Sequence, residues 1–385
     1  MSANGIRTAL PVILGVLAWA PSFASQRFAH PLPRDQTGVV LTLPAKYPRR
    51  WAFLDYASER IEIRDVGDDS RRVIGEVQAR DSTTMLIPKD RPEFYTADTV
   101  WSRYTRGTRT DYITVYDKRT LEPIGEIVLP GAKRALITAQ QGMFEFTDHE
   151  RLGLVFNFTP AASVTVVDLV HRKVLGDVDI PGCALIFPSG RIGFSTLCAS
   201  GTVFSVKLDA AGHVVGHSES KPFNHLGHNP LFTASTMIDG IRYFVTMRGD
   251  AQPIDMRHAD ARVLPSWPLV TPAERAAHWR PSGWQLVASD AHGELYVLMQ
   301  AHAHEGTQKD AADEVWVYDA ATKQRLRRLR LVRPGSSIAL THGAHPTLLV
   351  QADQRLDVYD PETGALIRSM DLPGLHTRLL IEPVR

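Results

Sequence analysis

Two cysteines have the most distinctive chemistry in this 385-residue chain, which contains no others. Between Cys183 and Cys198 the turn-forming run Pro188-Ser189-Gly190 separates two apolar stretches, and this pattern favours a hairpin. A turn centred between Gly190 and Arg191 would place the two cysteines directly opposite each other, at a separation that suits a disulfide. We therefore predict a disulfide, which would contribute about 3 kcal/mol to stability in the chain-entropy estimate. A metal site or a catalytic thiol is the alternative, but no histidine lies near them at ligand spacing.

Arginines and aromatic residues gather in the segment Trp101–Asp111, which the sequence predicts to be a polar loop between two strands. The segment includes Arg103, Arg106 and Arg109. A guanidinium group can hold a carboxylate or a phosphate through two parallel hydrogen bonds, so a ligand clamp is one interpretation. A salt-bridged loop that fixes neighbouring parts of the fold is the other, and the residues alone leave both open.

Three pairs of histidines have the spacing of metal ligands: His213 with His217, His225 with His228, and His302 with His304. None of these pairs is accompanied by a cysteine, aspartate or glutamate arrangement that specifies a metal geometry. The sequence also lacks a nucleophile elbow, a phosphate-binding loop and a zinc signature. We predict neither a metal site nor a catalytic residue in this chain.

A repeated strand pattern sets the frame in which these residues must lie. A β-branched or aromatic alternation closes on an aspartate, a turn follows, and a second strand begins. Seven copies end at or near these aspartates, which are on average about 49 residues apart: Asp65, Asp117, Asp168, Asp209, Asp255, Asp319 and Asp360. A strand repeat of this length predicts an all-β fold, a seven-bladed β-propeller in which each aspartate turn joins the two outer strands of a blade. A β-sandwich is the alternative, but seven copies exceed what one sandwich holds.

Two features interrupt or complete the predicted ring. Thr271-Pro272-Ala273-Glu274 is a capping box with proline at the first helical position, so a short helix is expected from Ala273 to Trp279. This helix either projects from a face where partners bind or packs over a blade edge. The apolar runs at residues 39–43 and 379–381 are expected to pair in one blade and close the ring.

The N-terminus predicts export. Arg7 precedes an apolar run from Ala9 to Ala20, and small residues before Ser25 suit a cleavage site after Ala24. Residues 1–24 are therefore predicted to be a signal peptide and residues 25–385 the propeller, because the apolar run is too short to cross a bilayer. The net charge of +1 and the absence of a basic patch argue against nucleic acid as a partner.

Several longer segments resemble the heavy (large) subunit of bacterial quinoprotein amine dehydrogenases. The motifs that carry this resemblance are Arg103-x-x-Arg106-Gly107-x-Arg109-x-Asp111, Phe158-Thr159-Pro160-Ala161 before Val166-Val167-Asp168, the pair Cys183 and Cys198, and Ala273-Glu274-Arg275 through Trp279-Arg280-Pro281-Ser282-Gly283-Trp284-Gln285. The segment from Glu305 to Arg325 is most similar to the aromatic amine dehydrogenase branch of that family. The resemblance covers essentially the whole chain after the predicted signal peptide.

The resemblance implies a non-catalytic subunit of a periplasmic enzyme. Such enzymes are heterotetramers of two heavy and two light chains. Their cofactor, tryptophan tryptophylquinone, is formed from two tryptophans of the light chain, so no cofactor is expected in this chain. The complex oxidatively deaminates primary amines and passes electrons to a small copper protein or a cytochrome. An exported β-propeller that binds another partner, without dehydrogenase activity, is the alternative.

The resemblance also indicates which residues would line the substrate channel or contact the light chain: Tyr56, Trp101, Arg103, Arg106, Arg109, Trp279 and Trp284. Heavy subunits carry a longer loop near the first of these positions, whereas Phe53–Ser58 here passes almost directly into the next strand. Tyr56 is the only aromatic residue left near that position, and packing at the end of a strand is its alternative role. A shortened loop would give a wider or differently shaped channel and an altered preference among amines.

Overall fold

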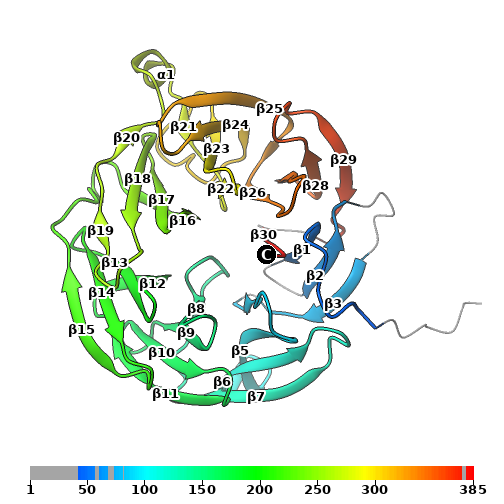
Figure 1. The fold of residues 1–385 in the computed structure, drawn as a ribbon, viewed down its shortest axis with the longest axis vertical. Coiled ribbons are helices and arrows are strands. Elements are labelled where there is room, and N and C mark those ends of the chain that lie inside the picture. Colours follow the sequence, from blue (N-terminus) through cyan, green and yellow to red (C-terminus); the bar gives the residue numbers. More distant parts are fainter. Residues whose placement is uncertain (1–41, 57–59, 68–72, 81, 375–378) are drawn as a thin grey trace, which may run out of the picture. The chain divides into compact units, whose positions relative to one another are not determined.

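The computed structural model describes residues 42–56, 60–67, 73–80, 82–374 and 379–385. These residues form seven antiparallel sheets arranged as a ring, which confirms the seven-bladed β-propeller (Figure 1). The predicted signal peptide and residues 39–41 of the expected closing strand lie outside the described residues, so these remain predictions. Among the described residues, no helix has the length and hydrophobicity needed to cross a membrane.

Every blade presents the same order of strands from the ring axis outward. The strands nearest the axis are β30 (Leu380–Pro383), β4 (Thr84–Leu86), β8 (Phe144–Thr147), β12 (Cys183–Pro188), β16 (Leu231–Ile238), β22 (Val287–Ser289), with β21 (Arg280–Pro281) beside it, and β26 (Ser337–Leu340). The second strands are β1 (Trp51–Asp55), β5 (Glu93–Arg103), β9 (Leu152–Asn157), β13 (Gly193–Cys198), β17 (Ile241–Thr246), β23 (Glu294–Gln300) and β27 (Leu348–Ala352).

The outer half of each blade is a hairpin built around one of the repeated aspartates. The third strands are β2 (Arg60–Asp65), β6 (Arg106–Asp117), β10 (Ser163–Asp168), β14 (Val203–Leu208), β18 (Asp250–Asp255), β24 (Ala312–Asp319) and β28 (Arg355–Tyr359). The outermost strands are β3 (Val73–Gln78), β7 (Pro123–Leu129), β11 (Lys173–Asp179), β15 (Val214–Glu219), β19 (Arg262–Val263), with β20 (Trp267–Pro268), β25 (Arg325–Gly335) and β29 (Leu366–Asp371). The prediction that the aspartate turns join the two outer strands is confirmed.

The aspartates recur because each one caps its turn. Asp117 Oδ1 accepts the backbone N–H groups of Arg119 (2.7 Å) and Thr120 (2.9 Å), and Asp360 Oδ1 accepts those of Glu362 (2.9 Å) and Thr363 (2.8 Å). The other five aspartates also accept a backbone N–H from two to four residues ahead. An ionised carboxylate at this position satisfies backbone donors that the turn would otherwise leave unpaired.

The antiparallel order gives the ring two distinct faces. The aspartate turns and the turns between first and second strands lie on one face, here called the aspartate face. The turns between second and third strands and the connections between blades lie on the other, here called the loop face.

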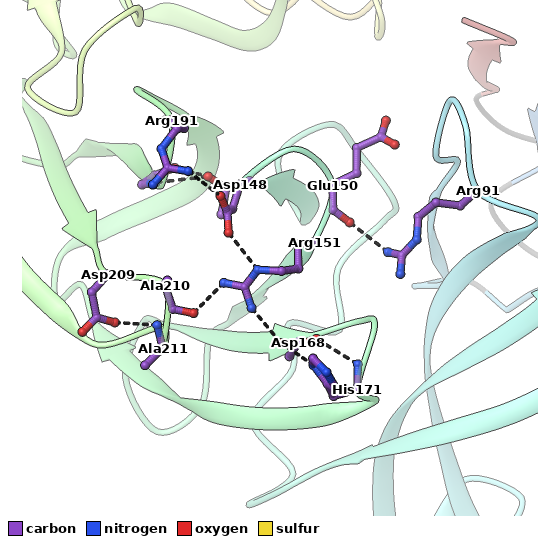
Figure 2. Close-up of polar contacts among 12 residues, drawn as sticks. Arg91, Asp148, Glu150, Arg151, Asp168, His171, Arg191, Asp209, Ala210 and Ala211 are labelled. Carbon is purple, nitrogen blue, oxygen red and sulfur yellow. Dashed lines mark hydrogen bonds and ion pairs between the residues drawn. The ribbon is translucent and has the colours of Figure 1, made fainter.

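Arg151 links neighbouring blades on the aspartate face (Figure 2). Its Nε donates to Asp148 (2.8 Å), its Nη1 to Asp168 (2.7 Å) and its Nη2 to the carbonyl of Ala210 in the next blade (2.5 Å). From that next blade, Arg191 also lies 3.5 Å from Asp148. These contacts hold two blades together, so the charged side chains named here have a structural role.

The C-terminal strand closes the ring. β30 pairs with β1, with Leu380 opposite Asp55 and Pro383 opposite Ala52, so the last strand completes the first blade. The C-terminal half of the predicted closure is therefore confirmed. The partner strand is Trp51–Asp55 rather than residues 39–43, of which Thr42 and Leu43 are described and lie outside any strand.

The predicted disulfide is present between β12 and β13. Cys183 and Cys198 are bonded and directly opposite in register, as the sequence indicated. Closer to the turn the register shifts by one residue, so that Phe187 rather than Ile186 faces Ser195. A bulge near Leu185, whose φ is 64°, takes up the extra residue.

Candidate functional site

A long hairpin projects from the loop face of the second blade. β5 continues to Arg103 and β6 begins at Arg106, so strands occupy most of the segment that the sequence predicted to be a loop. Val100 faces Thr110 and Trp101 faces Arg109 across the ladder. β-Branched and aromatic residues suit paired strands, which explains the difference. Tyr104 at the tip is 79% exposed, and the side chains of Arg103 and Arg106 are also exposed.

The base of this hairpin is held by Asp111, which is fully buried. Its carboxylate accepts two hydrogen bonds from Arg109 (2.9 and 3.0 Å), one from the Thr99 hydroxyl (2.7 Å) and one from the backbone N–H of Arg134 (2.9 Å). Arg109 therefore has the salt-bridged role that the sequence allowed, whereas Arg103 and Arg106 form no side-chain ion pair within the described residues.

Arg134 also anchors the base of this hairpin, and no sequence motif predicts this role. Its side chain is buried, and it donates to Thr99 Oγ1 (3.2 Å) and to the backbone carbonyl and hydroxyl of Ser82 (2.5 and 3.1 Å). Burial lowers the pKa of Arg134 to about 10, while Asp98 and Asp111 oppose that shift. Because its partners are 23 to 52 residues away, no local motif marks this role.

Trp284 lines a second feature of the loop face, a pocket of about 170 Å³ near the ring axis. Gln140, Phe232 and Leu380 contribute to the same wall. The Lys309 ammonium lies 5.6 Å from the centre of the Trp284 ring, a cation–π geometry. An aromatic wall with one cation can receive an aromatic or acidic side chain of a partner.

Trp279 lies elsewhere, beside the outer strand of the sixth blade. Its ring centre is 5.1 Å from that of Trp316, and the Arg328 guanidinium lies over both rings at 4.7 and 4.6 Å. Arg325 covers Trp316 at 4.3 Å, and Glu274 forms ion pairs with Arg325 (2.8 Å) and Arg328 (3.6 Å). This stack of alternating indoles and guanidinium groups indicates a packing role for Trp279.

Glu274 belongs to α1 (Pro272–Ala276), the predicted helix, which is three residues shorter than expected at its C-terminal end. The capping box is confirmed: Thr271 Oγ1 accepts from the Glu274 N–H (3.3 Å), and Glu274 Oε2 accepts from the Thr271 N–H (2.9 Å). Figure 1 shows α1 at the outer circumference of the ring. Its contacts therefore favour packing over a blade edge, the second of the two roles that the sequence allowed.

Tyr56 directly follows β1 on the loop face and is only 1% exposed. Its hydroxyl donates to Glu62 (2.8 Å), and the Arg60 guanidinium lies 4.2 Å from the ring centre. Burial and the bond to Glu62 raise the pKa of Tyr56 well above its ordinary value. β1 ends at Asp55 and β2 begins at Arg60, so the connection is short, and Tyr56 packs at the strand end.

The structure thus divides the seven predicted interface residues. One hairpin on the loop face carries Trp101, Arg103, Arg106 and Arg109. Trp284 lies on that same face, near the ring axis. Trp279 lies in a packed cluster beside the outer strand of the sixth blade, and Tyr56 is buried in a packed cluster at the end of β1. Contact with a light chain or with substrate remains a prediction for all seven.

Comparison with known proteins identifies one family. The family model for the methylamine dehydrogenase heavy chain (MADH) matches residues 59–381. The methylamine dehydrogenase heavy chain of Paracoccus versutus is 31% identical over 345 residues, covering 87% of this chain and 80% of that protein. The corresponding heavy chain of Methylorubrum extorquens is 29% identical over 317 residues, covering 80% of this chain and 76% of its own length.

Solved structures add support for the fold alone. A functionally unknown protein from Desulfotomaculum acetoxidans has a TM-score of 0.55 at 11% identity, covering 86% of this chain and 98% of that one. Dihydro-heme d1 dehydrogenase NirN in complex with DHE has a TM-score of 0.53 at 13% identity, covering 89% of this chain and 78% of that one. At such low identity, no functional residue can be transferred from either protein.

Proposed function

The chain belongs to the methylamine dehydrogenase heavy chain family, and from this we propose that it is the heavy subunit of an amine dehydrogenase. Its role would be to hold a catalytic light chain and to shape the route by which a primary amine reaches the cofactor. The observation that carries this proposal is the extent of the family match, which reaches every blade of the propeller from residue 59 to residue 381.

The cofactor in this proposal is tryptophan tryptophylquinone, formed within the light chain, and it supplies the oxidative deamination chemistry. The indole pair in this chain, Trp279 and Trp316, is covered by Arg325 and Arg328 and so is suited to packing. Two heavy and two light chains would assemble, and a small copper protein or a cytochrome would accept the electrons.

Export to the periplasm forms part of the same proposal. Two observations support it: the predicted signal peptide at residues 1–24, and the disulfide between Cys183 and Cys198. Disulfides persist in oxidising compartments and are rare in the bacterial cytosol.

The loop face is the proposed docking surface for the light chain. The projecting hairpin offers Arg103 and Arg106 as exposed cations. Trp284 and Lys309 form an aromatic wall close to the ring axis. Arginine and tryptophan are enriched among the residues that dominate binding at protein interfaces.

Co-expression with an amine dehydrogenase light chain, taken from a neighbouring reading frame where one is found, tests the proposal. We expect the two chains to co-purify and to reduce an artificial dye when supplied with methylamine, longer alkylamines or arylalkylamines. The isolated chain should show neither amine-dependent dye reduction nor a quinone absorbance band. Failure to co-purify would favour the alternative, an exported propeller without dehydrogenase activity, and amine oxidation by the isolated chain would contradict both assignments.

A further inference from the structure

The ring axis contains a cavity of about 480 Å³ that is separate from the projecting hairpin. The innermost strands of all seven blades contribute to its wall, from Thr84 on β4 to Glu382 on β30. A volume of this size is within the range of small-molecule binding sites. The cavity therefore has room for a ligand, and its charged side chains determine which one.

Two carboxylates face this cavity from different blades. Glu145 on β8 accepts one hydrogen bond, from the backbone N–H of Gly142 (3.1 Å). Glu382 on β30 has no hydrogen-bond or ion-pair partner in the described part of the chain, although it lines the cavity. Burial raises the pKa of both groups, to about 7 for Glu382, where Arg385 opposes the shift and Glu145 reinforces it.

Arg242 extends from β17 toward the same cavity. Its Nη1 donates to Ser235 Oγ (3.0 Å), and its guanidinium carbon lies 5.3 Å from the centre of the Phe187 ring. Among the residues that the structure describes, its buried Nε has no hydrogen-bond partner. Most of the donor fork is therefore unused, and such a fork matches the geometry of a carboxylate.

The acidic and basic groups of the cavity do not neutralise one another by direct contact. In the part of the chain that the structure describes, no ion pair within 4.0 Å joins Glu145 or Glu382 to Arg242 or Arg385. These charges still influence one another, since Arg242 and Arg385 both oppose the raised pKa of Glu145. These side chains are only partly exposed, apart from the exposed Arg385, and unpaired charges that are partly removed from water are costly. A ligand that pairs with them would therefore be stabilised.

We propose that the central cavity binds a small zwitterion, a molecule that carries both a carboxylate and an ammonium group. Arg242 would hold the carboxylate through its unused donor fork, and Glu382, assisted by Glu145, would hold the ammonium group. This proposal does not depend on the proposed dehydrogenase role, because it concerns only side chains of this propeller.

Simpler ligands match the cavity less well. A metal ion would find too few ligands, since the described residues contain no group of three or more histidine, cysteine, aspartate or glutamate side chains that could hold one. A simple anion would lie near the two carboxylates, and a simple amine would lie near Arg242 and Arg385. Only a ligand of both charges pairs with both sets of groups.

Titration calorimetry and thermal unfolding of the full exported chain test this inference. The probes are β-alanine, γ-aminobutyrate and ε-aminocaproate, which carry both charges at increasing separation, with propanoate and propylamine as singly charged controls. We expect at least one zwitterion to bind and to raise the melting temperature, and both singly charged probes to bind at least about tenfold more weakly.

Variants of the charged groups decide which atoms are responsible. Arg242→Gln and Glu382→Gln should each weaken binding about tenfold or more, whereas the exposed controls Arg257→Gln and Glu126→Gln should leave it unchanged. If Arg242→Gln does not fold, Arg242→Lys replaces it, because lysine keeps the charge and loses the fork. Absence of binding by every zwitterion, equal binding of propanoate or propylamine, or unchanged binding in both cavity variants would overturn the proposal.

Discussion

Glu382 links the stability of the propeller to pH. Its pKa rises from 4.5 to about 7 on folding, so the folded state binds this proton more tightly than the unfolded state. The stabilisation is complete below pH 4.5 and is lost as the pH rises through 7, where the cost is about 1–3 kcal/mol. We expect Glu382→Gln to be more stable than the native chain at pH 8 and nearly equal to it at pH 4.5. Urea unfolding at both pH values measures this, and a difference independent of pH would contradict it.

At the scale of single residues, the sequence indicated some of the residues that matter but few of the side chains that they contact. Tyr56 was located by its place after a strand, yet its burial depends on Glu62 and Arg60, which a one-dimensional pattern does not orient. Arg134 was missed because its partners come from distant connections. The charges of the cavity were missed for the same reason, since Glu145 and Arg242 stand on different blades.

At the scale of elements, substitutions in the projecting hairpin distinguish residues that stabilise the fold from residues that are proposed to dock a partner. Asp111→Asn should cost about 3 kcal/mol or more, because it removes the buried charge that pairs with the partly buried Arg109. Arg103→Ala with Arg106→Ala should change stability by no more than about 0.5 kcal/mol, since both side chains are exposed. If the hairpin docks a light chain, this double variant should nevertheless reduce co-purification. Loss of stability in the double variant, measured by urea unfolding, would show that the two arginines pack rather than dock.

The disulfide makes a second prediction at this scale. Cys183→Ser with Cys198→Ser should lower the free energy of unfolding by about 3 kcal/mol, because the bond closes a loop of 15 residues. Urea unfolding of the variant and of the oxidised chain measures the difference. The native chain should fall to the stability of the variant when a reductant is added, and a native chain insensitive to reductant would contradict the predicted contribution.

Elements whose signals are local were the ones that the sequence predicted well. The aspartate turns and the capping box each depend on hydrogen bonds between residues only a few positions apart, so their patterns survive in the sequence. The segment after Trp101 was predicted as a loop because its charges suggested exposure. Exposure and strand pairing are compatible in a projecting hairpin, where both faces of the ladder meet solvent.

At the scale of the whole molecule, the repeat predicts the ring, whereas the content of its axis depends on how the blades meet. Each innermost strand contributes one or a few side chains to the central cavity, and these come from positions between 84 and 385. No periodicity specifies their combination. The final apolar run of the sequence indicates the strand that closes the ring. The hydrogen bonds by which Gln285 holds that strand cannot be predicted, because Gln285 lies 96 positions away from its partner, Ile381.

Closure of the ring should therefore dominate global stability. Gln285 donates to the carbonyl of Ile381 (2.8 Å) and accepts from its N–H (2.9 Å), so one amide side chain satisfies both backbone groups of this residue of the last strand. Deleting residues 373–385 removes β30, exposes the edge of β1 and should lower the melting temperature by about 10 °C or more.

Gln285→Ala should cost about 2–3 kcal/mol, because it leaves two buried backbone groups unpaired. Gln300→Ala is the matched control, since the Gln300 Oε1 has no hydrogen-bond partner in the described part of the chain and little should be lost. Thermal and urea unfolding of the three variants test this order, and a deletion that melts like the native chain would show that the ring does not depend on its last strand.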